Sequence, residues 1–304
     1  MVKKPLLIAI VGPTASGKTD VAIRLAKQFN TEIISADSRQ FYKEIPLGTA
    51  APDIHQLAEV KHHFIGHLSI FDDYNVARYE KEVLNLLNEK FTQMPVMIMV
   101  GGSGLYIDAV CKGIDDLPDP DEQLRKDLDE KLQKQGIEIL QQELKLLDPE
   151  YYKVVDLKNP KRLIRALEIC LQTGKKYSDL RQNRPAKRNF NILKIGLKTD
   201  RKTLFERIEK RTDNMMKNGW LEEAKSVYPY RNLNSLNTVG YKELFKYLEG
   251  EWNLEFAVEK IKTNTRRYAK RQITWFNKDK DIFWFPNIQS TNLVNFLTEY
   301  LKKL

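Results

Sequence analysis

A glycine-rich loop near the N-terminus constrains this chain more than any other feature. The segment GPTASGKT at residues 12–19 matches the pattern G-x-x-x-x-G-K-[ST] and lies between an apolar run, Leu6–Val11, and a helical pattern, Lys18–Phe29. Such a loop turns backbone N–H groups toward phosphate oxygens, while its lysine adds a positive charge and its Thr19 hydroxyl can hold Mg²⁺. The motif leaves open whether the bound diphosphate belongs to ATP. The predicted diphosphate-binding residues are Gly12, Pro13, Thr14, Ala15, Ser16, Gly17, Lys18 and Thr19.

The order of apolar runs predicts an α/β fold. Strands are expected at 6–11, 32–36, 95–100 and 191–197, with helical patterns between them, and continuously apolar strands of this kind form parallel sheets covered on both faces. From about residue 116 to 188 the pattern is helical, with Asn159-Pro160 as a cap and first-turn proline. We therefore predict a P-loop NTPase-like parallel-sheet core, residues 1–115 and 189–304, with a helical C-terminal part and an inserted helical domain, residues 116–188.

Polar residues follow two of the predicted strands at their carboxyl ends, where open α/β sheets bind ligands. Asp37 heads the run Asp-Ser-Arg-Gln directly after the second strand, and the strand at 95–100 ends in Gly-Gly-Ser-Gly, with Ser103 as a possible donor. Asp37 could hold Mg²⁺ through water or remove a proton from an acceptor. Capping of the next turn is the purely structural alternative.

Basic residues are concentrated in two stretches. The chain has 50 Lys and Arg against 41 Asp and Glu, and residues 153–188 hold eleven of these cations against three acids, while residues 260–280 hold eight against one. Beside a phosphate loop, such clusters favour a nucleic acid partner over a merely solvated face. In the second stretch, aromatic rings that could stack unpaired bases, or pack in the core, are interleaved with four basic residues predicted to contact RNA: Arg266, Arg267, Lys270 and Arg271.

Composition excludes several other classes of protein. Two cysteines are too few for a disulfide framework or a structural zinc site, and no apolar run reaches the length of a membrane span. We expect a reducing, cytoplasmic compartment and no membrane partner. The group His55, His62, His63 and His67 lacks thiols and reliable metal-ligand spacing, so a structural role is expected for it.

An ordered set of motifs resembles the bacterial tRNA dimethylallyltransferases, also called isopentenyl-tRNA transferases. The matching segments run through nearly the whole chain: GPTASGKT at 12, DSRQ at 37, GTAAP at 48, HH at 62, GGSGLY at 101, NPKRLIRALE at 159, RIEKR at 207, VGYKE at 239 and TRRYAKRQITWF at 265. A P-loop by itself is unspecific, whereas this ordered set is highly specific.

The resemblance implies a P-loop-kinase-like core with a helical insertion, and transfer of a dimethylallyl group from dimethylallyl diphosphate to N6 of adenine 37 in the anticodon loop of tRNA, with Mg²⁺ and release of diphosphate. By motif matching, Asp37 is the general base, and Lys18, Thr19 and the loop amides hold the departing diphosphate, with Arg211 as a further diphosphate or tRNA contact. The residues expected to contact tRNA are Asp37, Ser38, Arg39, Gln40, Ser103, Arg125, Lys161, Arg162, Leu163, Ile164 and Arg165. A monomer is expected.

Three positions depart from the family's usual pattern. Ser103 stands where Thr is usual, Ala51 where Lys is usual, and Gly66 where Asp is usual, which puts local substrate contacts in doubt. Two other functions remain open at this point. A P-loop kinase for small molecules or nucleosides would explain residues 1–110 but leaves the basic clusters without purpose. A non-catalytic RNA-binding module would leave Asp37 and the P-loop unexplained.

Overall fold

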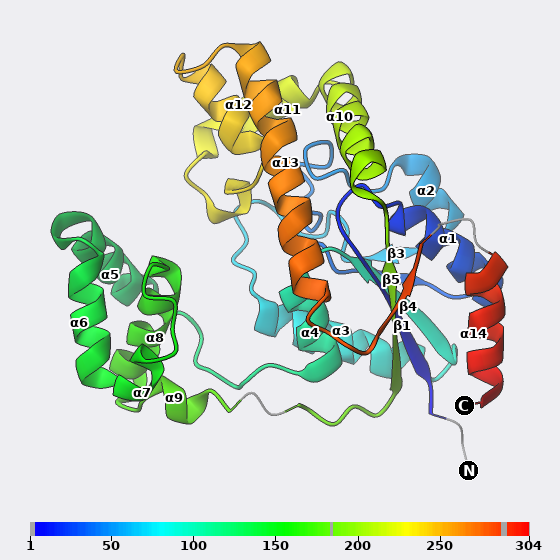
Figure 1. The fold of residues 1–304 in the computed structure, drawn as a ribbon, viewed down its shortest axis with the longest axis horizontal. Coiled ribbons are helices and arrows are strands. Elements are labelled where there is room, and N and C mark those ends of the chain that lie inside the picture. Colours follow the sequence, from blue (N-terminus) through cyan, green and yellow to red (C-terminus); the bar gives the residue numbers. More distant parts are fainter. Residues whose placement is uncertain (1–3, 183–184, 287–290, 304) are drawn as a thin grey trace. The chain divides into compact units, whose positions relative to one another are not determined.

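A computed structural model describes residues 4–182, 185–286 and 291–303. It separates into two compact units, the first made of Met1–Cys111 and Lys187–Leu304 and the second of Lys112–Ala186 (Figure 1). The predicted α/β class with a parallel-sheet core is confirmed.

The first unit is built on a six-stranded sheet whose described pairs are all parallel, in the order β3-β2-β4-β1-β5-β6. The strands are β1 (Leu6–Val11), β2 (Ile33–Ser35), β3 (His62–His63), β4 (Val96–Gly101), β5 (Asn191–Leu197) and β6 (Ile282–Phe285). Two of them, β3 and β6, were not predicted, and the C-terminal third is therefore not wholly helical. Both are short edge strands, of two and four residues. The two histidines of β3 form no apolar run, whereas the apolar run of β6, IFWF, was a signal that the sequence analysis missed.

Helices cover both faces of this sheet. The helices of the first unit are α1 (Lys18–Phe29), α2 (Ile54–Glu59), α3 (Val76–Lys90), α4 (Gly104–Lys112), α10 (Arg201–Lys217), α11 (Trp220–Val227), α12 (Tyr241–Leu248), α13 (Leu254–Phe276) and α14 (Thr291–Lys303). Two short 3₁₀ turns, Tyr228–Tyr230 and Asn234–Leu236, connect α11 to α12.

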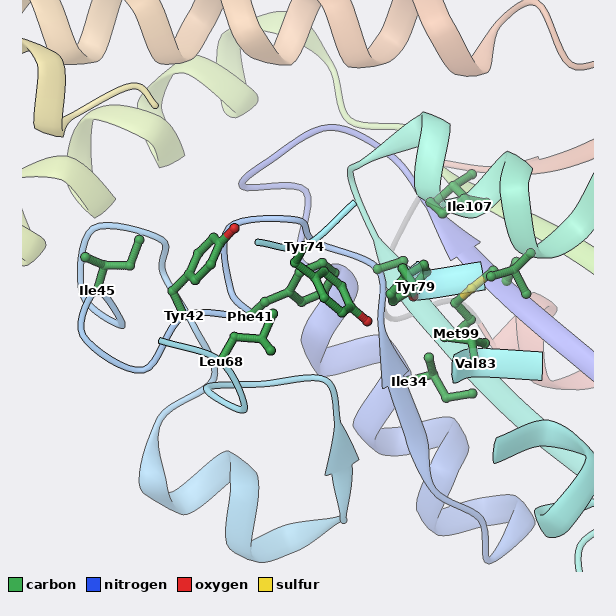
Figure 2. Close-up of a cluster of buried hydrophobic side chains, with 14 of the residues drawn as sticks. Ile34, Phe41, Tyr42, Ile45, Leu68, Tyr74, Tyr79, Val83, Met99 and Ile107 are labelled. Atoms are coloured by element: carbon green, nitrogen blue, oxygen red, sulfur yellow. The ribbon is translucent and has the colours of Figure 1, made fainter. Parts of the chain in front are cut away.

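Alternating side chains of the central strand divide the core in two. Leu6, Ile8 and Ile10 of β1 pack with residues of α1 and α14, while the intervening residues of β1 face the larger cluster on the other side. Figure 2 shows part of that larger cluster, including Phe41 and Tyr79, whose rings stack with centroids 5.3 Å apart. Because both faces are buried, the sheet is rigid, and its carboxyl ends hold their loops in fixed positions.

The second unit is a helical bundle with its own core. Its helices are α5 (Glu122–Gln135), α6 (Ile137–Leu147), α7 (Pro149–Tyr152), α8 (Pro160–Thr173) and α9 (Tyr177–Leu180). The predicted start of α8 is confirmed: Asn159 accepts a hydrogen bond from the Arg162 N–H, and Pro160 occupies the first turn. The structure places the ends of this unit within a few residues of the predicted insertion, 116–188.

Candidate functional site

The phosphate loop joins β1 to α1, as its motif requires. Gly12 and Gly17 have positive φ values of 148° and 84°, which let the chain turn from β1 into α1, and residues of this turn and of the α1 N-terminus line one cavity. Lys18 folds back over the loop and donates from Nζ to the Pro13 carbonyl at 2.7 Å. The Ser16 hydroxyl is buried and has no hydrogen-bond partner in the part of the chain that the structure describes.

A second basic residue reaches the same loop from far along the chain. Arg211 of α10 donates from Nη2 to the Thr14 hydroxyl at 2.7 Å, and Arg207, one turn earlier on α10, also lines the cavity. Burial lowers the pKa of Lys18 to about 8 and lowers the pKa of Arg211. Two cations held in a desolvated cavity indicate a site for a strongly charged anion.

The predicted carboxylate lies beside these cations. Asp37 follows the end of β2, and its Oδ1 accepts from the Arg39 N–H at 3.1 Å. Burial raises the pKa of Asp37, and the neighbouring charges of Lys18, Arg39 and Arg211 act in the opposite direction. A carboxylate made more basic by desolvation suits proton removal.

The glycine-rich end of β4 fits closely against the end of β2. A Cβ at Gly101 would lie 2.2 Å from the Ala36 carbonyl oxygen, so only glycine allows this approach. Ser103 then accepts from the Ser38 N–H at 3.0 Å, and its hydroxyl lies 3.2 Å from that of Ser38. Ser103 therefore orders the turn that carries Asp37.

Two cavities meet at Asp37. The first, of about 430 Å³, is lined by the phosphate loop, Lys18 and Arg207, and the second, of about 360 Å³, is lined by polar and aromatic residues that include Tyr268 and Arg271. Both cavities are lined by five residues: Thr14, Asp37, Thr49, Ala50 and Arg211. This arrangement places one carboxylate and one guanidinium where a group held in the first cavity could react with a group held in the second.

Comparisons with known proteins show which family this chain belongs to. Residues 40–279 match the family model described as IPP transferase. The chain is 53% identical over 97% of its length to a protein named tRNA dimethylallyltransferase 1 from Bacteroides fragilis, of which 98% is covered.

The chain belongs to the IPP transferase family.

Solved structures of the IPP transferase family have the same fold. A tRNA isopentenylpyrophosphate transferase from Bacillus halodurans has a TM-score of 0.73 and 35% identity, with 99% of this chain and 98% of that one covered. A eukaryotic dimethylallyltransferase acting on tRNA has a TM-score of 0.83 and 26% identity, with 98% of this chain and 80% of that one covered. The family predicted from the motifs is confirmed.

Two of the residues predicted to contact tRNA, Arg39 and Gln40, form hydrogen bonds to backbone carbonyls in this structure. Arg39 donates to the carbonyls of Asn234 and Ser235 at 2.8 and 3.0 Å. Gln40 donates to the carbonyls of Thr49 and Ala50 at 3.3 and 3.0 Å. Both residues line a cavity while bonding in this way, so they also shape the site.

The predicted tRNA-binding stretch on α8 divides by burial. Lys161 and Arg162 are exposed, whereas Leu163 and Ile164 are 0% and 8% exposed and pack in the core of the second unit. Helical periodicity turns these two apolar side chains inward, and contact of this stretch with tRNA stays a prediction.

The other two predicted cations of this unit are tied to one buried acid. Arg125 and Arg165 donate to the fully buried Glu168 at 2.8 and 2.7 Å. Their positions are therefore fixed within the bundle, and any contact with tRNA would have to share that ion pair.

The basic and aromatic residues of α13 differ in their surroundings: some line the second cavity, one is buried in the core, and others are ion-paired, hydrogen-bonded or exposed. Arg271 and Tyr268 line the second cavity, whereas Phe276 is buried in the core. Arg266 is bound to Glu209 at 2.8 Å, Arg267 donates to the side chain of Asn264 at 3.2 Å, and Lys270 is exposed.

Reasoning from the sequence missed several residues that line the cavities, among them Arg207 and Gln272. Gln272 of α13 is 5% exposed, accepts from the Thr14 N–H at 2.7 Å and donates to the Gly102 carbonyl at 3.0 Å. It therefore joins the phosphate loop to the end of β4. Its place in the motif TRRYAKRQITWF was the available signal, but a buried glutamine carries no mark of its role in the sequence.

Proposed function

We propose that this protein transfers the dimethylallyl group of dimethylallyl diphosphate to N6 of adenine 37 in tRNA and releases diphosphate. The carrying observation is that Asp37 lies where an anion-binding cavity meets a second cavity with polar and aromatic walls. The names of the relatives state a dimethylallyl group that is transferred and a tRNA that is acted on. Two adjoining cavities could hold such a donor and such an acceptor.

The donor's diphosphate occupies the first cavity in this proposal. The phosphate-loop amides, Lys18 and Arg211 surround the leaving oxygen, and their charge stabilises the electrons that it receives as the bond to carbon breaks. The Thr19 hydroxyl and the diphosphate oxygens fit the oxygen-ligand preference of Mg²⁺, which would neutralise part of the leaving group's charge. In the described residues, no cluster of three His, Cys, Asp or Glu side chains offers a separate metal site.

The acceptor base enters the second cavity, splayed out of its stack. The nitrogen N6 forms a bond to the allylic carbon while that carbon's bond to the diphosphate oxygen breaks. The nitrogen thereby gains a positive charge, and Asp37 removes one of its two protons. An exocyclic amine is a poor nucleophile, so stabilisation of the leaving group carries most of the reaction and the proton leaves late.

The described residues contain no helix long and apolar enough to cross a membrane. We expect a monomer acting in the cytoplasm.

The proposal is tested by incubating the protein with labelled dimethylallyl diphosphate and tRNA. We expect label in the RNA without ATP, and none when adenine 37 is replaced by guanine, which presents a keto oxygen in place of the amine. Asp37→Asn should lower turnover by about 10²-fold or more with little change in donor affinity. The control Asp72→Asn alters an exposed carboxylate that likewise accepts from a backbone N–H, that of Ser69 at 2.7 Å, and should leave turnover unchanged. ATP-dependent phosphorylation of an acceptor, label in the guanine variant, or normal turnover of Asp37→Asn would contradict the proposal.

A further inference from the structure

One wall shared by the two cavities is a loop, residues 45–51. Gln40 of the first cavity donates to its Thr49 and Ala50 carbonyls, and a residue outside both cavities binds its tip. Its residues Thr49 and Ala50 line both cavities. Internal hydrogen bonds make the loop compact: the Ala50 N–H donates to the Leu47 carbonyl at 2.9 Å, and the Thr49 hydroxyl donates to the Ile45 carbonyl at 2.9 Å. Ala50 also has a positive φ of 49°, which a non-glycine residue adopts only where the surroundings enforce it.

A single carboxylate binds the tip of this loop. Glu223 of α11 accepts from the Leu47 N–H through Oε2 and from the Gly48 N–H through Oε1, both at 2.8 Å. Its Oε1 also accepts from the hydroxyl of Tyr241, a residue of α12 that is 0% exposed. Two adjacent backbone donors on one carboxylate form a charge-assisted, bidentate contact, which fixes direction as well as distance.

The residues around this contact pack closely against the loop. A Cβ at Gly48 would lie 2.2 Å from the Tyr241 hydroxyl oxygen and 2.3 Å from Nε1 of Trp220. Trp220 is 2% exposed, and its ring also packs on Gly240, where a Cβ would lie 2.0 Å from it. The motifs GTAAP at 48 and VGYKE at 239 therefore converge on the base of α11, although they lie far apart in the sequence.

We propose that Glu223 is a positioning residue for the transfer reaction, because its carboxylate clamps loop 45–51 in the conformation that forms the wall between the two cavities. This inference rests on the proposed function. Glu223 touches neither cavity, and it acts through Thr49 and Ala50, whose place beside Asp37 decides how closely the two reacting groups can approach. Lys18 and Arg211, the proposed diphosphate ligands, bond to Pro13 and Thr14 of the phosphate loop and not to the clamp.

The test compares Glu223→Gln with Glu222→Gln. The amide keeps the size of the side chain but puts an NH₂ group against a backbone N–H donor, so one loop contact must break. Glu222 is the neighbouring exposed acid, paired with Lys225 at 2.7 Å on the surface, and its replacement should change nothing at the loop. Tyr241→Phe is a milder variant that removes one hydrogen bond to Glu223 and leaves the ring in the core.

Two measurements are made on each variant. Hydrogen exchange should show Leu47 and Gly48 amides protected in the wild-type protein and in Glu222→Gln, but exposed in Glu223→Gln. Steady-state transfer to tRNA should show kcat lowered by on the order of 10- to 10²-fold in Glu223→Gln, as misplacement of a reacting pair predicts, with the affinity for inorganic pyrophosphate unchanged. Tyr241→Phe should give a smaller loss of the same kind.

Unchanged amide exchange in Glu223→Gln, or turnover equal to that of Glu222→Gln, would overturn the inference. A fall in pyrophosphate affinity parallel to kcat would do the same, because it would show a general loss of structure. If the wild-type protein transfers no label, the proposed function fails, while the exchange measurement still decides whether the clamp exists.

Discussion

At the scale of single residues, the site is defined by charges held close together before any ligand binds. Lys18 and Arg211 lie in the same half-buried cavity as Asp37, and burial disfavours the charged form of each of them. Such crowding is unfavourable in the empty protein and becomes favourable when an anion of high charge enters. The ligand therefore supplies the charge that the cavity lacks.

The lowered pKa of Lys18 gives the donor affinity a defined pH dependence. Lys18 in the free protein is charged below about pH 8, and a bound diphosphate would raise this pKa. The affinity for the donor should therefore be highest below about pH 8 and should fall as the pH rises beyond it. The fall should be up to roughly tenfold per pH unit, because binding must then be accompanied by uptake of a proton.

The measurement is titration calorimetry with a non-reactive donor analogue, comparing the wild-type protein with Lys18→Arg. Arginine stays charged throughout this range, so the variant's affinity should not show the fall, and the ratio of the two affinities removes any titration of the analogue itself. A ratio independent of pH would contradict the prediction.

At the scale of elements, α8 illustrates how one helix serves two purposes. Its inward face carries Leu163 and Leu167, both 0% exposed, and the buried Glu168 that binds Arg165. Its first turn carries the exposed Lys161 and Arg162. The positive charges of this stretch are thus not equivalent, since some hold the bundle together and others are free to meet a polyanion.

Replacing Lys161 and Arg162 together with Ala should weaken tRNA binding and lower the slope of log affinity against log salt by about two units, or somewhat less if the RNA there is single-stranded. Donor binding should be retained, because both residues lie in the second unit. The control replaces Lys131 and Lys134 of α5 with Ala, which removes the same amount of positive charge. Each of these lysines is ion-paired to a glutamate. Equal slopes for the two double variants would show that the cluster on α8 is only a solvated face.

At the scale of the whole molecule, the second unit is inserted into the first at a single place. The Ala186 N–H donates to the Lys112 carbonyl at 2.6 Å, so the chain enters and leaves the second unit side by side. In the first unit, Arg188 anchors the returning segment by donating to the carbonyls of Val110 and Ala109 at 2.9 and 2.7 Å. The residues that line both cavities all belong to the first unit.

Replacing residues 113–185 by a short Gly-Ser linker should therefore leave a folded first unit, since its ends already lie together and its two cores are complete without the insertion. We expect cooperative unfolding and unchanged affinity for inorganic pyrophosphate, but transfer to tRNA reduced by the loss of RNA contacts. Transfer at the full rate would show that the second unit does not bind the RNA. A chain that lost pyrophosphate binding would show that the first unit depends on the insertion.

The sequence by itself predicted the elements whose signals are local. The phosphate loop lies between its strand and helix in one continuous segment, Asp37 lies two residues after the end of its strand, and the cap at Asn159 immediately precedes its helix. Turn conformation, strand ends and helix caps depend on neighbours within a few positions, so the residues that determine them are visible together.

Only the tertiary structure decided which of these residues meet. Gln272 bonds to Thr14 across 258 positions, Arg211 reaches Thr14 across 197, and Glu223 binds Gly48 across 175. It also assigned Arg125 to a buried ion pair. These contacts depend on how the helices pack against the sheet. That packing is determined by many weak interactions between residues spread along the whole chain, so it cannot be predicted from any short segment.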